Sequence, residues 1–319
     1  INTYWSENHV LATSQSLMDW QHKSKNGYNY LLAWNEDVLV GILGYIPTCR
    51  YDKALNSQNI LWLSLWKVRD DFKSAALGLR LLKALETVEN NIGLAVNGIN
   101  STHPPMYRAL GYQVYDLIQY YLVNTSRSQN ILQSPNNYPL AIPNIGNALL
   151  VRMYSNDLLS LKLSHEEVVP FKTPSYFIKR FLEHPFYDYK VYGVVQDDNI
   201  RAIIAIRIVY QMRSCVLRII DFFGDTNVIG DCGSAFSKLM NEFNAEYIDF
   251  WQYGISSNVL SKAGFEAIDP NGKLICPNYF EPFKANNERV TCCIKSKTKI
   301  STIVCRADGD QDRPNMLAL

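Results

Sequence analysis

The six residues from Lys73 to Gly78, with the sequence KSAALG, have the types and spacing expected of an anion-binding loop. They carry few large side chains, so backbone N–H groups at the start of a following helix stay open to an anion and a ligand can approach closely. Lys73 adds a positive charge. The segment therefore predicts a phosphate or pyrophosphate site, although the same small residues would also suit a helix that only packs tightly.

Two regular elements must flank this loop. Ile60 to Val68 is rich in β-branched, aromatic and aliphatic residues and is too short for a capped helix, which predicts a largely buried strand. From Ser74 onward the spacing of the leucines predicts a helix with one apolar face. The leucines that define this face are Leu77, Leu81, Leu82 and Leu85.

Two motifs resemble those of the GCN5-related N-acetyltransferases. Lys73-x-x-Ala76-x-Gly78 is similar to the family's Arg/Gln-x-x-Gly-x-Gly/Ala signature, which holds the pyrophosphate of coenzyme A, but has Lys for Arg/Gln and Ala for the first Gly. Downstream, the spacing of the family's second signature, Asn-x-x-x-x-x-Leu-Tyr-x-x-Leu-Gly-Phe, is matched by Asn100, Tyr107, Leu110 and Gly111. The resemblance covers about residues 1–124.

The resemblance implies an acyl-CoA co-substrate and no metal. In the family, the strand expected at Trp62–Val68 splays from the next, near Gly93–Ile99, and unpaired backbone groups between them receive the amides of pantetheine. A backbone N–H near Leu65–Lys67 would bind the thioester carbonyl and the oxyanion of the reaction. The expected cofactor-binding residues are Leu65, Trp66, Lys67, Val68, Lys73, Ser74, Ala75, Ala76, Leu77, Gly78, Leu79 and Asn100.

Three residues are candidates for catalysis. Tyr107 stands at the position of the family's Tyr and would protonate the leaving thiolate, unless it is only a packed helix aromatic. His103 lies in the loop before that helix and titrates near neutrality, so it could act as a base, although exposed loop histidines are usually inert. Ser64, on the cofactor strand, could orient the nucleophile. A dedicated base is not required, because an amine can lose its proton to water or to the sulfur.

Composition limits the classes of partner. The 319 residues include 31 basic and 30 acidic residues, and the net charge of +1 gives no electrostatic footprint for nucleic acid or a membrane surface. Seven cysteines without a C-x-x-C pair favour a reduced, cytoplasmic protein over a disulfide framework or metal site. No apolar run approaches the ~20 residues of a membrane span, and the first residues do not resemble a signal peptide. We expect small-molecule partners and a monomer or homodimer.

The chain order predicts an α+β fold of two tandem domains like those of the family, each with a mixed, mostly antiparallel sheet flanked by helices. Residues 1–124 form the acyl-CoA-binding domain and residues 125–158, rich in Pro and polar residues, a linker. In residues 159–319 a second hairpin, Tyr189–Ile208, repeats Tyr28–Tyr45, which indicates a tandem duplication. The second copy is degenerate, with Leu260 in place of the Tyr, and is expected to bind the acceptor.

The end of the chain suggests the acceptor. Arg306–Asn315 carries alternating acids that are either a solvated terminus or a substrate site. With the two domains, this ending resembles two-domain N-acyltransferases that act on nucleotide-linked amino sugars, such as dTDP-4-amino-4,6-dideoxyglucose, in bacterial surface-polysaccharide pathways. The resemblance implies that Arg313 contacts a phosphate and that aromatic residues stack a base. The expected substrate-binding residues are Trp251, Tyr253, Asp308, Asp310, Asp312 and Arg313.

Two other functions stay open. A tandem aminoacyltransferase of the peptidoglycan-branching type has a similar architecture, but it uses aminoacyl-tRNA, and this chain has no basic stripe for RNA. A non-catalytic acyl-CoA-binding protein would need neither Tyr107 nor His103.

Overall fold

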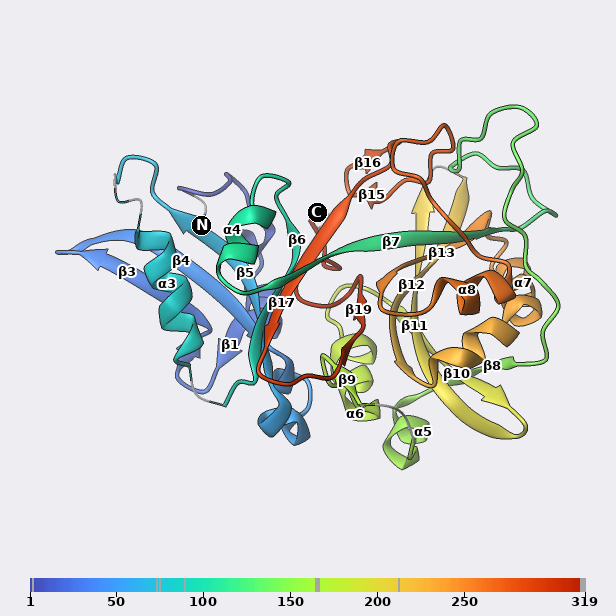
Figure 1. The fold of residues 1–319 in the computed structure, drawn as a ribbon, viewed down its shortest axis with the longest axis horizontal. Helices are drawn as coiled ribbons and strands as arrows, with labels where there is room; N and C mark the ends of the chain where they lie inside the picture. The colour runs from blue at the N-terminus through green and yellow to red at the C-terminus, as the bar shows by residue number, and fades with distance from the viewer. Residues whose placement is uncertain are drawn as a thin grey trace. The chain divides into compact units, whose positions relative to one another are not determined.

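A computed structural model describes residues 1, 3–72, 74, 76–88, 90–163, 167–211 and 213–315 (Figure 1). The chain forms two compact units. Unit 1 comprises Ile1–Val114, Thr291–Lys299 and Asp308–Leu319, and unit 2 comprises Tyr115–Val290 and Ile300–Ala307. Two segments from the end of the chain thus belong with the N-terminal residues, whereas the sequence expectation assigned all of 159–319 to the second domain. Lys73 and Ala75, two of the expected cofactor-binding residues, lie outside the described residues.

Unit 1 is a mixed sheet flanked by helices, in the strand order β3-β4-β5-β6-β17. The strand pairs are antiparallel except β5 and β6, which are parallel. The elements of unit 1 are α1 Val10–Thr13, α2 Gln15–His22, β1 Lys23–Ser24, β2 Gly27–Tyr28, β3 Tyr30–Asn35, β4 Val38–Pro47, η1 Thr48–Arg50, η2 Lys53–Gln58, β5 Ile60–Val68, α3 Leu77–Glu86, β6 Gly93–Ile99, α4 Pro104–Ala109 and most of β17 Val290–Ser296.

Different helices pack against the unit 1 sheet in two separate core clusters. Leu81, Leu82 and Leu85 of α3 join the core cluster formed with Leu43 and Leu61 of the sheet, and Figure 1 shows α3 lying across β3 and β4. A second cluster combines residues of α1 and α2 with one residue of β5; its buried members are Val10, Leu11, Leu17 and Leu65. The leucine spacing that predicted an apolar face on α3 is therefore confirmed, with the helix beginning at Leu77.

Unit 2 has a second mixed sheet, in the strand order β7-β13-β12-β11-β10-β8, with β14 paired to β7 and β19 paired to β13. Its core residues are almost all fully buried. The elements are β7 Gln113–Val123, of which Tyr115 onward belongs to unit 2, β8 Leu149–Met153, α5 Ser155–Ser160, β9 Val168–Val169, α6 Pro174–Phe177, η3 Ile178–Leu182, β10 Tyr189–Gln196, β11 Asn199–Gln211, β12 Ser214–Gly224, η4 Thr226–Asp231, α7 Gly233–Glu242, β13 Tyr247–Tyr253, α8 Ser257–Ala263, β14 Glu266–Ala267, β15 Tyr279–Phe280, β16 Phe283–Lys284, β18 Ser301–Thr302 and β19 Val304–Cys305.

The two units share an order of elements: a helix, an antiparallel hairpin, a third strand, a helix, a parallel fourth strand and a further helix. In unit 2 this order runs from α6 to α8, and β12 and β13 are parallel over three residue pairs, from Leu217↔Ile248 to Ile219↔Phe250. A common origin of the units stays a prediction. The expected linker contains a strand of the unit 2 sheet, because β8 pairs with β10.

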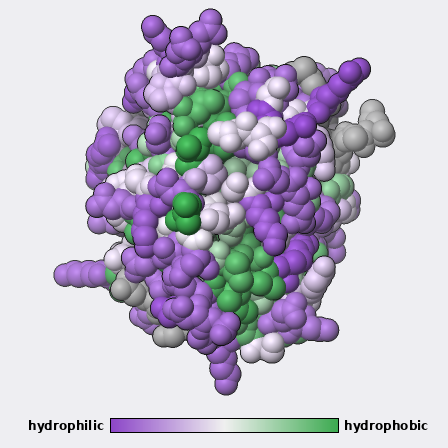
Figure 2. Space-filling view, turned by 90° about the vertical axis from the view of Figure 1, so that its right-hand side faces the viewer, coloured by the Kyte–Doolittle hydropathy of each residue, from purple (hydrophilic) through white to green (hydrophobic). Residues whose placement is uncertain are grey.

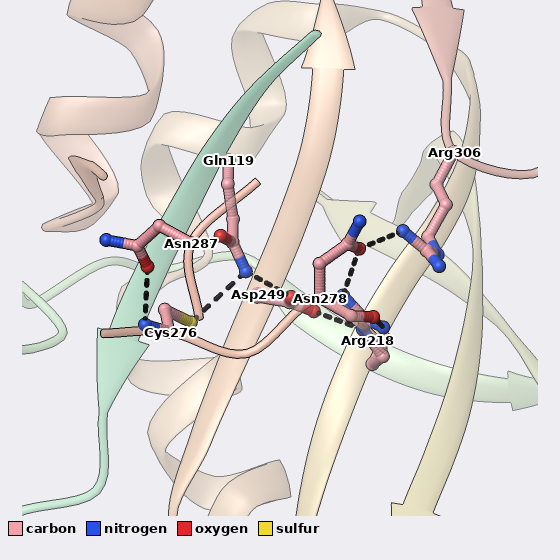
Figure 3. A network of polar contacts seen from close by, with 7 residues as sticks. All are labelled: Gln119, Arg218, Asp249, Cys276, Asn278, Asn287 and Arg306. Carbon is pink, nitrogen blue, oxygen red and sulfur yellow. Dashed lines mark hydrogen bonds and ion pairs between the residues drawn. The ribbon is translucent and has the colours of Figure 1, made fainter. Parts of the chain in front are cut away.

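One face of the unit 2 sheet holds a buried polar network (Figure 3). The Arg218 guanidinium donates to both carboxylate oxygens of Asp249, at 3.0 and 2.8 Å, and to the Asn278 carbonyl at 2.7 Å. Gln119 on β7 also donates to Asp249, at 2.8 Å. Both partners of the ion pair are almost fully buried, with side-chain exposures of 1% and 0%. The network thereby ties β7, β12 and β13 together.

Several large hydrophobic side chains are exposed on the surface of unit 2. Exposed large hydrophobic residues of unit 2 include Ile145, Leu149, Val151 and Tyr210. Figure 2 shows hydrophobic areas separated by hydrophilic ones on the face it presents. None of the helices in the described part of the chain is long and apolar enough to cross a bilayer.

His22, the last residue of α2, should make unit 1 sensitive to acid. It is fully buried, its Nδ1 contacts the Tyr45 carbonyl at 3.3 Å, and burial lowers its pKa to about 3. Between pH 6.5 and 3 the unfolded chain therefore binds a proton that the folded chain does not, so stability falls as the pH falls through this range. We expect the free energy of unfolding to fall by about 1.4 kcal/mol for each pH unit below about 6.5 on account of His22.

Denaturant unfolding of the wild type and of a His22→Gln variant at pH 7 and pH 5 measures this effect. The variant should lose less stability between the two pH values than the wild type does. Exposed His103, replaced by Gln, serves as the control and should leave the pH dependence unchanged. Equal pH dependence in the wild type and the His22 variant would contradict the assignment.

Candidate active site

An opening between β5 and β6 forms the framework of the candidate site in unit 1. The two strands pair in parallel only from Ile60↔Gly93 to Trp62↔Ala95. β5 stays paired with β4 as far as Val68, and β6 stays paired with β17 as far as Ile99. Beyond Trp62 and Ala95 no residue pairs between the two strands exist among the described residues. The predicted splay of these strands is therefore present, and backbone groups on their inner edges have no ladder partners there.

β5 has a bulge where this opening begins. Leu43 lies opposite Trp66 and Tyr45 lies opposite Leu63, so that Ser64 and Leu65 together face the single residue Gly44. A bulge bends a strand and redirects its side chains. Leu65 accordingly joins the cluster of α1 and α2, whereas Trp66 packs against the cluster of α3. The bulge thus places Ser64 and Leu65 at the mouth of the opening.

The start of α3 lies next to β5. The N-cap residue of α3 is Ala76, and no side chain caps the helix. The Leu77 N–H donates to the Ser74 carbonyl at 3.2 Å, and the other N–H groups of the first turn are left without a capping side chain. A Cβ atom added at Gly78 would lie 3.4 Å from the ring of Trp66, an ordinary contact. Lys67 forms an ion pair with Asp70 at 2.7 Å. Of the described cofactor-binding candidates, residues 65–68 lie at the end of β5 and residues 76–79 at the start of α3, whereas Asn100 lies in the turn before α4; their role in binding a cofactor stays a prediction.

Tyr107 lies in α4 and is 3% exposed. It packs in the core cluster that α3 shares with the sheet, with its ring edge against that of Tyr112 at a centroid distance of 5.1 Å. Burial raises the pKa of its phenol well above the usual value, so the group stays protonated at neutral pH. Its hydroxyl makes no hydrogen bond within the described part of the chain. Tyr107 is therefore both a packed aromatic and a protonated phenol without an internal partner.

His103 and Asn100 form the turn that precedes α4. Both residues are exposed. The Asn100 side-chain oxygen accepts hydrogen bonds from the backbone N–H and the hydroxyl of Thr102, at 3.1 and 3.0 Å, and the His103 N–H donates to the Asn100 carbonyl at 2.9 Å. The Asn100 amide nitrogen remains available to a ligand. His103 makes no side-chain contact in the described residues that would position it as a base.

The Asp308–Arg313 segment contacts both strands of the opening. The Asn97 side chain on β6 donates to the Asp308 carbonyl at 3.1 Å, and the Gln311 side chain donates to the Asn97 carbonyl at 2.9 Å. Gly98 has a φ of +75°, and a Cβ there would lie 2.4 Å from the Gln311 side chain. On the β5 side, a Cβ at Gly309 would lie 3.2 Å from Trp62. The segment thus spans the opening.

A polar cluster follows from this placement. The Ser64 hydroxyl donates to Oδ2 of Asp310 at 3.1 Å, and Arg313 Nε lies 3.8 Å from the same oxygen. His9, the N-cap of α1, accepts the Leu11 N–H through Nδ1, and burial together with the charge of Arg313 lowers its pKa to about 4. Asp308 and Asp312 are 1% and 0% exposed. The solvated-terminus alternative is therefore wrong for these residues, whereas their role in substrate binding stays a prediction.

The other two expected substrate-binding residues belong to unit 2. Trp251 and Tyr253 lie on β13 and line a cavity of about 450 Å³ together with residues of β7 and of the segments 267–270 and 288–290. Tyr253 stacks on Tyr115 at a centroid distance of 4.0 Å. The indole N–H of Trp251 has no hydrogen-bond partner among the described residues. The cavity has the size of a small-molecule site.

Sequence reasoning missed three residues of the unit 1 site. Asn97 was recognisable as a polar residue inside the apolar strand GLAVNGI, because a buried amide in a strand needs a partner. Gln311 stands between Asp310 and Asp312, which gives no local sign of its contact with β6. His9 is an isolated histidine in the N-terminal segment, where no neighbouring residue indicates a polar partner. Nothing local in the sequence pairs these residues with one another.

No family model matches this sequence, and no curated protein matches it either. Among solved structures, the chain is similar to a GCN5-related N-acetyltransferase from Anabaena variabilis, with 8% identity, a TM-score of 0.49 and 85% of this chain covered. A conserved protein from Enterococcus faecalis has 8% identity and a TM-score of 0.49, with 84% of this chain covered. A GCN5-related N-acetyltransferase from Kribbella flavida has 10% identity and a TM-score of 0.42, also with 84% of this chain covered. The chain spans 63%, 62% and 59% of the length of these three proteins.

Proposed function

We propose that this chain is an acyl-CoA-dependent N-acyltransferase whose acceptor is the amino group of a nucleotide-linked amino-deoxy sugar of the dTDP type. One observation carries the acyl-CoA part: β5 and β6 part after Trp62 and Ala95, directly before the bulge of β5 and next to a helix whose N-terminus has no side-chain cap. Apart from the Asn97 carbonyl, which Gln311 binds, such an opening offers backbone groups without strand partners to a ligand that has amides of its own. The described residues of the two sequence motifs lie at the start of α3 and in the turn and helix of α4.

The residues present fit acyl-CoA in two ways. The Leu77 N–H is bonded to the Ser74 carbonyl, but no side chain caps the remaining N–H groups of the first turn, which suit a pyrophosphate, and Gly78 leaves space beside Trp66. The bulged part of β5 would offer a backbone N–H near Leu65–Lys67 to the thioester carbonyl, which also stabilises the oxyanion of the tetrahedral intermediate. The co-substrate supplies an activated thioester, and the protein supplies orientation and hydrogen bonds.

The proposed reaction is a direct attack by a neutral amine. Its nitrogen lone pair forms a bond to the thioester carbon, the carbon–sulfur bond breaks, and the electron pair leaves with sulfur. Tyr107 gives its proton to the thiolate and regains one from the proton that the amine loses, so that a proton passes overall from nitrogen to sulfur. The phenol of Tyr107, like that of tyrosines in general, is protonated at neutral pH before the reaction, and burial raises its pKa further.

The proposed identity of the acceptor rests on two points: the resemblance of residues 306–315 to nucleotide-sugar N-acyltransferases, and the polar cluster at Ser64. A carboxylate beside the opening, Asp310, can accept hydrogen bonds from an amino group, and Arg313 can contact a phosphate. Trp251 and Tyr253, which line the cavity of unit 2, are proposed by themselves as residues that could stack a nucleotide base. A role in surface-polysaccharide synthesis follows from the same proposal.

A transfer assay tests this function. Purified protein is mixed with acetyl-CoA and either dTDP-4-amino-4,6-dideoxyglucose, the free amino sugar or dTDP-glucose, and release of free thiol is followed. We expect thiol release and an N-acetylated product, identified by mass spectrometry, with the amino nucleotide sugar and none with dTDP-glucose. No thiol release with any amine, or the same release without an acceptor, would contradict the proposal.

A further inference from the structure

The ion pair between Asp310 and Arg313 is loose although both side chains are largely buried; of the described pairs, Arg207 and Glu281 have a similar distance, 3.9 Å, with a more exposed carboxylate. Each side chain is 13% exposed, yet Arg313 Nε and Asp310 Oδ2 are 3.8 Å apart and form no hydrogen bond. Arg313 Nε has no hydrogen-bond partner in the described residues. By contrast, the buried Arg218–Asp249 pair has a distance of 2.8 Å, and even the half-exposed Lys295–Glu86 pair has 2.7 Å.

Two charges withdrawn from water without close pairing are costly to the fold. The position of Asp310 is nevertheless fixed, because Ser64 at the bulge of β5 donates to its Oδ2. The other carboxylate oxygen, Oδ1, makes no hydrogen bond within the described part of the chain. Asp310 can therefore accept further hydrogen bonds and Arg313 can donate them, while both side chains lie beside the opening.

Two titratable side chains beside the pair, His9 and Tyr30, add no charge at neutral pH. The pKa of His9 is lowered to about 4, first by burial and then by Arg313, so its imidazole is neutral. The pKa of Tyr30 is raised by burial and by Asp310, so its phenol is also neutral. Asp308 and Asp312 are fully buried, so the partly exposed Asp310 carboxylate and Arg313 guanidinium are the charged groups of the segment that a ligand can reach. Together they complement a ligand that carries both an ammonium and an anionic group.

We propose that Asp310 and Arg313 form an acceptor subsite that selects amines bearing an anionic group. Asp310 accepts hydrogen bonds from the acceptor's amino group, with Ser64 as the residue that positions it, and Arg313 binds the anion. The inference rests on the proposed function for the role of the amine. It deepens that function, because it predicts that the acceptor is recognised as a zwitterion and not through the amine alone.

Direct binding of small probes tests the subsite without any acyl transfer. Isothermal titration compares glucosamine 6-phosphate, which has both charges, with glucosamine and with glucose 6-phosphate. We expect glucosamine 6-phosphate to bind at least tenfold more tightly than either other sugar. Asp310→Asn should reduce its affinity to that of glucose 6-phosphate, and Arg313→Met to that of glucosamine. Asp37→Asn, at an exposed turn of unit 1, is the matched control and should change nothing.

Equal affinity for the three sugars, or unchanged binding in both variants, would overturn the inference. Because Asp310→Asn could fold poorly, Ser64→Ala provides a second variant, expected to weaken binding of glucosamine 6-phosphate several-fold and that of glucose 6-phosphate not at all; no change would also overturn the subsite. Titration with acetyl-CoA is a separate measurement. If acetyl-CoA does not bind but glucosamine 6-phosphate does, the acyltransferase proposal is contradicted and the subsite for zwitterions remains supported.

Discussion

Replacing Arg218 with methionine is expected to lower the free energy of unfolding by about 3–5 kcal/mol, the typical cost of breaking a buried pair. The change removes two hydrogen bonds to Asp249 and one to the Asn278 carbonyl (Figure 3). The Asp249 carboxylate, which is fully buried, would keep its hydrogen bond from Gln119 but lose its counter-charge. Chemical denaturation followed by tryptophan fluorescence measures the loss.

The control is Arg201, which pairs with Asp225 at 2.9 Å in the same unit but with side chains that are 50% and 25% exposed. Arg201→Met should cost about 0–1 kcal/mol, as exposed pairs do. The double variant Arg218→Met, Asp249→Leu should be more stable than Arg218→Met alone, because no unpaired charge remains. A double variant that is less stable than Arg218→Met would contradict the explanation that the unpaired charge of Asp249 causes the loss of stability.

Replacing Tyr107 with phenylalanine is expected to slow acyl transfer by about 10²- to 10⁴-fold, the usual contribution of a positioned proton donor. Affinity for acetyl-CoA should change little, because the phenyl ring keeps its packing against Tyr112 and only the hydroxyl is removed. Steady-state transfer rates and titration with acetyl-CoA separate the two effects.

Tyr112→Phe is the matched control. Tyr112 lies in the same cluster, is 4% exposed, and has a hydroxyl without a hydrogen-bond partner in the described residues. Its removal should leave transfer unchanged and should not destabilise the protein. Undiminished turnover in Tyr107→Phe would remove the proposed role of Tyr107 as the proton donor.

Local patterns predicted the elements that carry the site. The bounds expected for β5, Ile60–Val68, are those of the structure, because the segment is dense in residues that favour buried strands. The strand expected near Gly93–Ile99 from the family resemblance is also present, as β6. Tyr107 was placed on a helix, and α4 spans Pro104–Ala109. The hairpin of β3 and β4 was recognisable from the turn residues between two strand-like runs.

Long-range partners could not be predicted in the same way. β17 completes the unit 1 sheet beside β6, with Cys293 opposite Val96, and no local periodicity encodes a pairing between segments so far apart in the chain. The sequence of Ile60–Val68 is that of a regular strand, and no residue type in it indicates the bulge at Ser64. The contact between Ser64 and Asp310 depends on both features, so residue types suggested each group separately but not their encounter.

The most direct test of the acyl-CoA site is isothermal titration of acetyl-CoA into the wild type, Gly78→Ala and Gly78→Glu. A Cβ at Gly78 meets Trp66 at 3.4 Å, so alanine should fit and bind acetyl-CoA nearly as the wild type does. Glutamate adds bulk and a negative charge where the pyrophosphate is proposed to lie, and should weaken binding at least 100-fold, a loss of about 2.7 kcal/mol. Binding that is lost only in Gly78→Glu would support the account. No binding by the wild type, or equal binding by all three proteins, would contradict it.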